Sequence, residues 1–164
     1  MAIDAAQVIV GKPGRVLAAR WWQWGCPESG RSPISDKTGA LAGQNQPDDV
    51  WFLAGTFGGS AERHCTVPAG RPLFFPVFNT KRAVGLFGKP ARITPAMAEA
   101  ELDGTTLELH EFTSGRFKLG GKKHIAWGLW CVVEPLSLGG HVVSFRSKLP
   151  QGFWVDVTYQ LVVA

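Results

Sequence analysis

Histidine is the residue type in this chain that is best suited to proton transfer near neutral pH. No two histidines stand in an HExxH or HxH arrangement that would predict a zinc site; the four are His64, His110, His124 and His141. The pattern therefore predicts no metal and no other cofactor. His64 and His141 are weak candidates for a general base. Asp36 or Asp156 would orient the ring in a hydrolase-type site beside the polar loop 28–49. A structural hydrogen-bonding role is the alternative for both histidines.

Nucleophiles and acidic groups give no sharper motif. No serine lies in a GxSxG sequence. Cys65 directly follows His64, so on a strand their side chains point to opposite faces. Asp36, Asp48 and Asp49 offer hard oxygen ligands for calcium, but they lack EF-hand spacing and equally fit a solvated acidic loop. These patterns favour a non-enzymatic protein, with the hydrolase kept as an alternative.

Aromatic residues supply the binding hypothesis, since seven tryptophans accompany a single tyrosine. Trp154 shares the polar face of a predicted strand with Asp156, Thr158 and Gln160. An indole plane beside hydrogen-bonding groups is able to hold a sugar ring. Contact with a neighbouring subunit, or with the helix that carries Trp21, is the other interpretation of Trp154.

A third class of function is structural. The segment Ile125 to Val133 is apolar on both faces, with Trp127 and Trp130 pointing to opposite sides. Such a strand fits lateral packing between copies in a homo-oligomer, or a β-sandwich subunit that decorates a filament, shell or virion. It equally fits a central strand within one chain.

Two segments have helical signals. Between residues 14 and 25, Leu17, Trp21 and Trp24 recur at helical spacing, and Gly25 supplies the stop. Trp22 lies off this stripe and is expected to be exposed. Thr94 and Pro95 begin a second predicted helix over residues 94–102, because they suit its cap and first position.

The remaining periodicity is that of strands. Val50 to Ala54 reads as a buried central strand, and Pro76 predicts an edge position or a bulge in the strand around Leu73 to Phe78. In Phe153 to Val163, apolar and polar residues alternate, which is typical of a half-buried antiparallel strand. The fold class predicted is mainly β: an antiparallel β-sandwich or jelly roll with the two short helices, as a single domain over residues 1–164.

Composition limits the partners. The 164 residues are 45% apolar and 18% charged, which favours a folded core over disorder. The net charge of +4 is scattered, and no nucleic-acid-binding motif is present, so no nucleic-acid partner is predicted.

No apolar run approaches the length of about 20 residues that a membrane-spanning helix needs. Met1 to Asp4 lacks the features of a secretory leader, which predicts a protein that is not exported or a chain without its leader. Three cysteines, Cys26, Cys65 and Cys131, leave at least one unpaired, and a Cys26–Cys65 disulfide is one option.

Several blocks of sequence form a recognisable series: ARWWQW at 19–24, DKTG at 36–39, VWFLAGTFGG at 50–59, RHCTVPAGRPLFFPVFN at 63–79, PLSLGGH at 135–141 and DVTY at 156–159. In these blocks the chain resembles a family of mostly exported bacterial β-domain proteins. The resemblance implies an extracytoplasmic or secreted β domain and no particular activity. Members of that family often carry a further cysteine, a partner for Cys65, in the segment that here reads Leu41–Ala42. From the aromatic residues, and not from the resemblance, we expect a non-enzymatic binding or structural module, with carbohydrate, a cell surface or another protein as its partner.

Overall fold

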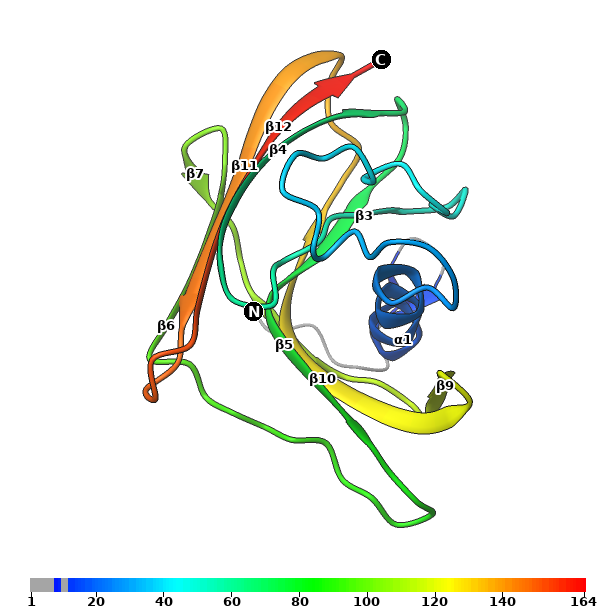
Figure 1. Cartoon of the computed structure of the whole chain (residues 1–164). Coiled ribbons are helices and arrows are strands. Elements are labelled where there is room, and N and C mark those ends of the chain that lie inside the picture. The colour runs from blue at the N-terminus through cyan, green and yellow to red at the C-terminus, as the bar shows by residue number, and fades with distance from the viewer. Residues whose placement is uncertain (1–7, 10–11) are drawn as a thin grey trace.

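The computed structural model describes residues 8–9 and 12–164, mostly as β-strands in two layers with one helix (Figure 1). The prediction drawn from residues 1–4 lies outside the described residues. The elements in chain order are β1 (Val8–Ile9), β2 (Lys12–Pro13), α1 (Gly14–Gly25), β3 (Trp51–Phe52), β4 (Gly59–Val67), β5 (Leu73–Ala83), β6 (Met97–Leu102), β7 (Thr105–Thr106), β8 (His110–Thr113), β9 (Phe117–Leu119), β10 (Lys122–Val133), β11 (Gly139–Lys148) and β12 (Trp154–Val163).

The strands form two larger sheets, and the predicted mainly β class is confirmed. One sheet has the order β3-β5-β10-β8, with β9 beside β10, and the other has the order β4-β12-β11-β6-β7. The prediction of purely antiparallel sheets is wrong, because β3 pairs in parallel with β5 and β4 pairs in parallel with β12. Alternation of apolar residues reports which face of a strand is buried, not the direction of its neighbour.

Two apolar layers hold the sheets and the helix together. Between the sheets, Phe75 of β5 stacks on Phe145 of β11 with ring centroids 5.0 Å apart. On the other side of the first sheet, α1 packs Trp21 against Trp130 of β10, with centroids 5.7 Å apart. The first sheet is thus covered on both faces, whereas the second has one face turned away from the core (Figure 1).

The predicted helix over residues 14–25 is confirmed, and its stripe of Leu17, Trp21 and Trp24 is buried. The expected exposure of Trp22 is wrong, since only 6% of this residue is exposed. Its ring meets Trp21 edge-to-face, and the Lys81 ammonium lies over it at 5.5 Å. Trp22 thus belongs to the apolar cluster between α1 and the first sheet, a contact that periodicity within the helix does not predict.

The second predicted helix, over residues 94–102, is wrong. Residues 97–102 form β6, which pairs with β11 in continuous register. The strand turns at Asp103 and Gly104, whose φ angles of 49° and 81° are those of a tight hairpin turn. Alanine and glutamate are good helix formers, but the differences in helix propensity between residues are small, and pairing with β11 together with the Asp-Gly turn outweighs them.

Two further strand predictions concern Val50 to Ala54 and the strand that contains Pro76. Val50 to Ala54 is buried as predicted, but only Trp51 and Phe52 pair, at the edge of their sheet and not its centre. The bulge alternative for Pro76 is confirmed, because the β5–β10 register shifts between Leu129 and Trp130, opposite that proline. A residue without a backbone N–H is accommodated by this local irregularity.

Two further predictions concern β10 and β12. The central-strand interpretation of Ile125 to Val133 is confirmed, and Trp127 and Trp130 are buried within this chain, so neither is offered to another copy. In β12 the odd-numbered residues from Val155 to Val163 are buried, as the alternation predicts. Phe153 is the exception: it precedes the strand and is partly exposed.

The described residues contain no helix that is both long and apolar enough to cross a membrane. The three cysteines are all free thiols, so the disulfide between Cys26 and Cys65 does not form in this structure.

Candidate functional site

The second sheet has one side turned away from the core, on β4, β12, β11 and β6, which we call the outer face. It carries polar side chains together with the exposed apolar side chains of Val142, Trp154 and Val162. Side chains of β12 that alternate with the buried ones point to this side. The register places Thr158 beside Ser144 of β11 and Glu62 of β4. Two residues before Thr158, on the same face of β12, Asp156 lies beside Arg146. The pairing of strands therefore assembles distant residues into rows across the sheet.

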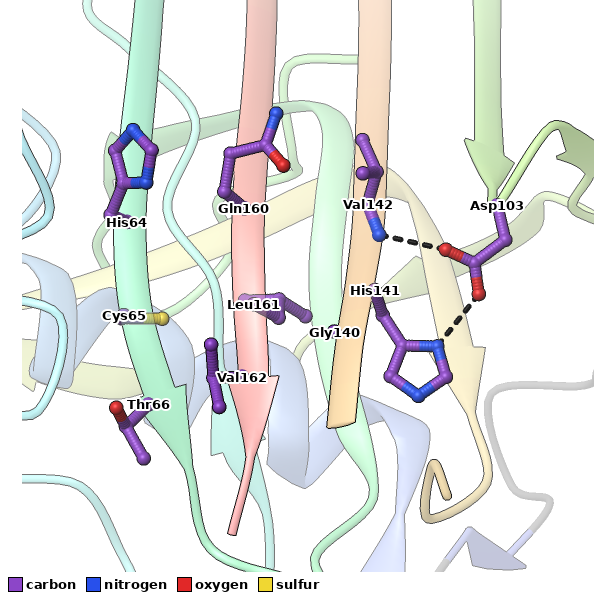
Figure 2. Close-up of a pocket in the computed structure, with 10 residues that line it drawn as sticks. All are labelled: His64, Cys65, Thr66, Asp103, Gly140, His141, Val142, Gln160, Leu161 and Val162. Carbon is purple, nitrogen blue, oxygen red and sulfur yellow. Dashed lines mark hydrogen bonds and ion pairs between the residues drawn. The ribbon is translucent and has the colours of Figure 1, made fainter. Parts of the chain in front are cut away.

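Two shallow hollows lie along these rows. The larger, of about 520 Å³, lies over β4, β12 and β11 and is drawn in Figure 2. His64, Gln160 and Val142 stand on its three neighbouring strands, and Gly140 contributes no side chain. The smaller hollow, of about 230 Å³, is lined by polar side chains: Glu99, Glu101, Ser144, Arg146, Asp156 and Thr158. Arg146 forms an ion pair with Glu99 across the sheet.

The predicted binding residues fall on this face. Asp156 and Thr158 line the smaller hollow, and Trp154 lies one row farther along β12, opposite Lys148. Trp154 is 47% exposed. The suggested contact with the helix that carries Trp21 is wrong, because α1 packs on the other sheet. An exposed indole beside hydrogen-bonding groups is therefore present as the alternation predicts.

His141 has a different carboxylate partner from those predicted. Its Nδ1 lies 2.7 Å from Oδ2 of Asp103, in the turn after β6 (Figure 2). Its Nε2 lies 2.8 Å from the backbone oxygen of Ser137 and 3.3 Å from the hydroxyl of the same residue. The residue types are those of a Ser-His-Asp arrangement, and neither Ser137 nor Asp103 was singled out by the sequence.

The hydrogen bonds of this imidazole fit a structural role. Both ring nitrogens face acceptors, so the doubly protonated ring satisfies both. The hydrogen bond with Asp103, followed by the one with the Ser137 carbonyl, raises the pKa of His141. With its Nε2 proton directed at a carbonyl, the ring does not accept the Ser137 hydroxyl proton as a nucleophile-activating base would. His141 thereby ties the loop before β11 to the β6–β7 turn.

This arrangement predicts a pH dependence that NMR can measure. The pKa of His141 should lie above its ordinary value of 6.5, and Asp103→Asn should lower it. The raised pKa means that the histidine stabilises the fold below pH 6.5 and that this contribution is lost as pH rises through the folded-state pKa. The pKa of Asp103 is lowered, chiefly by the hydrogen bond from His141, so its contribution is present above pH 3.8 and lost as pH falls further.

The measurement is a ring-proton titration of His141, assigned by comparison with His141→Gln. A folded-state pKa at or below 6.5, or one that Asp103→Asn leaves unchanged, would contradict the proposed tie between the loop and the turn.

The acidic loop residues serve the loop itself. The Asp36 carboxylate accepts hydrogen bonds from the backbone N–H groups of Thr38, Gly39 and Leu41. Burial works to raise the pKa of Asp36, but these hydrogen bonds outweigh it and the pKa is lowered. Asp49 forms an ion pair with Arg20, at 2.7 Å. Within residues 8–9 and 12–164, no cluster of three or more His, Cys, Asp or Glu side chains is arranged to hold a metal ion.

His64 and Cys65 point to opposite faces of β4, as predicted. His64 is exposed on the outer face. The Asp36 carboxylate, which the sequence offered as its partner, accepts hydrogen bonds from the backbone of its own turn instead. Cys65 packs toward the core beside Trp51, and burial raises the pKa of its thiol to about 11. A thiol with so high a pKa is a poor nucleophile at neutral pH.

The residue that sequence reasoning missed is Arg63. It occupies an inward position of β4 and is 1% exposed. Its guanidinium donates to four backbone oxygens at 2.5–3.0 Å and to the Tyr159 hydroxyl at 3.0 Å; the four belong to Ile34, Asp36, Ala54 and Gly55. The signal that could have identified this role is a charged residue at an inward position of a strand whose other inward residues are apolar.

Arg63 joins three parts of the chain that position the outer face. Its acceptors come from the loop after α1 and from the turn between β3 and β4. Tyr159 of β12 also accepts a hydrogen bond from the Ala54 N–H at 2.9 Å. The two strands that carry His64 and Gln160 are thus fixed to the loop layer by one buried network.

Comparisons with protein-family models, with curated proteins and with solved structures gave no match to this chain.

Proposed function

We propose that the protein is a non-enzymatic carbohydrate-binding module of β-sandwich type, and that it binds its ligand along the outer face. The observation that carries the proposal is the exposed Trp154 on the same strand face as Asp156 and Thr158. The family-like sequence blocks support a location outside the cytoplasm, where glycans of the cell surface are the partners within reach.

The chemistry of the face matches that of a sugar. A pyranose ring has an apolar C–H side that packs on an indole and a rim of hydroxyl groups that need donors and acceptors. Asp156 and Thr158 offer such groups one and two rows from the indole. Most of the side chains that line this hollow are polar, and they offer hydrogen-bond donors and acceptors to a hydroxyl-rich ligand.

The length and charge of the face narrow the ligand class. From Trp154 to Val162 the strand covers about 26 Å, since each residue advances by about 3.3 Å. A linear chain of several sugar units fits such a track. Carboxylates outnumber cations along it: Glu62, Glu99, Glu101 and Asp156 against Arg146 and Lys148. Neutral or amino-sugar polymers are therefore favoured over acidic polysaccharides, which the carboxylates would repel.

Trp154→Ala tests the proposal most directly. Loss of a ring that covers apolar ligand surface should cost at least about 1.4 kcal/mol, a tenfold increase in Kd. The measurement is a glycan array to find the ligand, followed by titration calorimetry of wild type and variant. Leu138→Ala is the matched control, because Leu138 is 74% exposed in the loop before β11, outside both hollows.

A wild-type protein that binds no neutral or amino-sugar glycan on the array would contradict the proposal. So would an affinity that Trp154→Ala and Leu138→Ala change equally.

A further inference from the structure

Positive charge is concentrated at one end of the molecule. Eight of the 17 Lys and Arg residues lie in segments 80–98 and 113–133, which contain none of the 13 Asp and Glu residues. Seven of the eight are exposed, and six of these have no ion pair with a carboxylate among the described residues: Arg82, Lys89, Arg116, Lys118, Lys122 and Lys123. The other two have contacts of their own, because Arg92 pairs with Glu111 and Lys81 lies over Trp22.

The fold brings the two segments side by side. The connection from β5 to β6 extends away from the body of the protein (Figure 1), next to the β9–β10 hairpin. The Val84 N–H donates to the Lys123 carbonyl at 2.9 Å. Arg116 donates to the carbonyl oxygens of Gly85 and Leu86. These bonds hold the connection against the hairpin, so their exposed cations form one group.

The most exposed large apolar side chains of the described residues lie at the centre of this group. Phe87 is 93% exposed and Leu86 is 78% exposed. Beside them is a hollow of about 470 Å³ that Val84, Leu86, Arg116, Lys122 and Lys123 help to line. An adjacent pair of apolar side chains displayed in this way indicates an interaction surface.

We propose that this end of the protein, which we call the basic tip (residues 82–89 with Arg116, Lys118, Lys122 and Lys123), docks on an anionic lipid surface. Leu86 and Phe87 enter the boundary between headgroups and acyl chains, and the surrounding cations contact lipid phosphates. Charge complementarity favours this occupant, because every charged side chain of the basic tip is a cation. The apolar pair selects a lipid surface over a soluble polyanion, which offers nothing apolar to bury.

The inference does not depend on the proposed glycan site. Trp154 lies on the outer face of the other sheet, and neither hollow of that face includes a residue of the basic tip. A protein held by its tip keeps a separate surface for a second ligand.

Vesicle sedimentation tests the proposal with the full chain. One set of vesicles contains phosphatidylglycerol in phosphatidylcholine, and the other contains phosphatidylcholine alone; neither presents a sugar polymer. The partition coefficient should be at least tenfold larger on the anionic vesicles and should fall as salt is added. The double variant Leu86→Ser/Phe87→Ser and the double variant Lys122→Glu/Lys123→Glu should each lower it at least tenfold.

Leu138→Ser serves as the matched control, because it removes an equally exposed leucine elsewhere and should leave partition unchanged. Thermal unfolding of each variant establishes that the tip changes leave the fold intact. Equal partition of wild type on both vesicle types would overturn the proposal. It would also be overturned if the charge reversal weakened binding while Leu86→Ser/Phe87→Ser did not and heparin or single-stranded DNA displaced the protein fully, since that result describes a soluble-polyanion site.

Discussion

Replacing Arg63 with methionine is expected to lower the free energy of unfolding by about 4 kcal/mol, because buried acceptors left without a donor cost about 1–3 kcal/mol each. Four backbone oxygens and the Tyr159 hydroxyl lose a donor in this variant. The Ala54 oxygen keeps the Tyr159 hydroxyl as a donor at 3.3 Å, so the backbone oxygens of Ile34, Asp36 and Gly55 are the three that lose their donor. A protein of ordinary stability, about 5–15 kcal/mol, would lose a large part of it.

Urea unfolding of wild type and Arg63→Met measures this effect, and Arg31→Met is the matched control on an exposed arginine. Arg63→Lys separates charge from geometry: an ammonium offers three donors at one atom and is unable to reach five separated acceptors. Lysine should therefore rescue little of the loss. An unfolding free energy of Arg63→Met within about 1 kcal/mol of wild type would show that the network is not a main source of stability.

Gly39→Ala is the second change with a large expected effect. Gly39 has a φ angle of +93°, which side-chain-bearing residues rarely adopt, and an added Cβ would lie 2.3 Å from the backbone oxygen of His64. That oxygen belongs to β4 and is unable to move like a side chain. The variant should lose about 3 kcal/mol or more, because strain at φ adds to the displacement of the loop.

Gly30→Ala isolates the two contributions. Gly30 has a similar φ of +88° in the same loop, but an added Cβ there meets nothing within 4 Å. It should cost about 1 kcal/mol, close to the backbone preference alone. Equal urea midpoints for the two variants would contradict the close approach of Gly39 to β4. The hydrogen bond from the His64 N–H to the Thr38 carbonyl, at 2.9 Å, should weaken in Gly39→Ala only, which amide exchange at His64 detects.

Strong local periodicity is what made parts of the fold predictable. In β12 each residue from Val155 to Val163 takes the face that alternation assigns to it, since one side of the strand packs on the core. In α1 the spacing of Leu17, Trp21 and Trp24 gave both the helix and its buried side. These signals lie within one element and need no knowledge of its neighbours.

The wrong predictions concern residues whose structure depends on a neighbouring element. Residues 97–102 are acceptable in a helix, and only the edge offered by β11 makes them a strand. Trp22 is buried in the cluster between α1 and the first sheet, where Lys81 from another element lies over its ring. The parallel pairing of β4 with β12 is likewise a matter of which strands meet, which no local pattern records.

The candidate site likewise has residues that the sequence predicts and contacts that it does not. Trp154, Asp156 and Thr158 belong to one strand, so their common face followed from the sequence. The partnership of His141 with Asp103 joins two strands through a turn, and spacing along the chain carries no trace of it. The Arg63 network draws its acceptors from backbone oxygens, which every residue possesses, so residue type names the donor but not the acceptors.

The position of β12 between β4 and β11 has a consequence for how the protein is made. β4 leaves the ribosome early and has no partner strand in its sheet until residues 154–163 emerge. Through that interval Arg63 lacks the Tyr159 hydroxyl, and the backbone hydrogen-bonding groups of β4 lack their partner strand. This sheet therefore closes as a late, non-local step, and its completion rather than helix formation should set the pace at which the nascent chain reaches its native state.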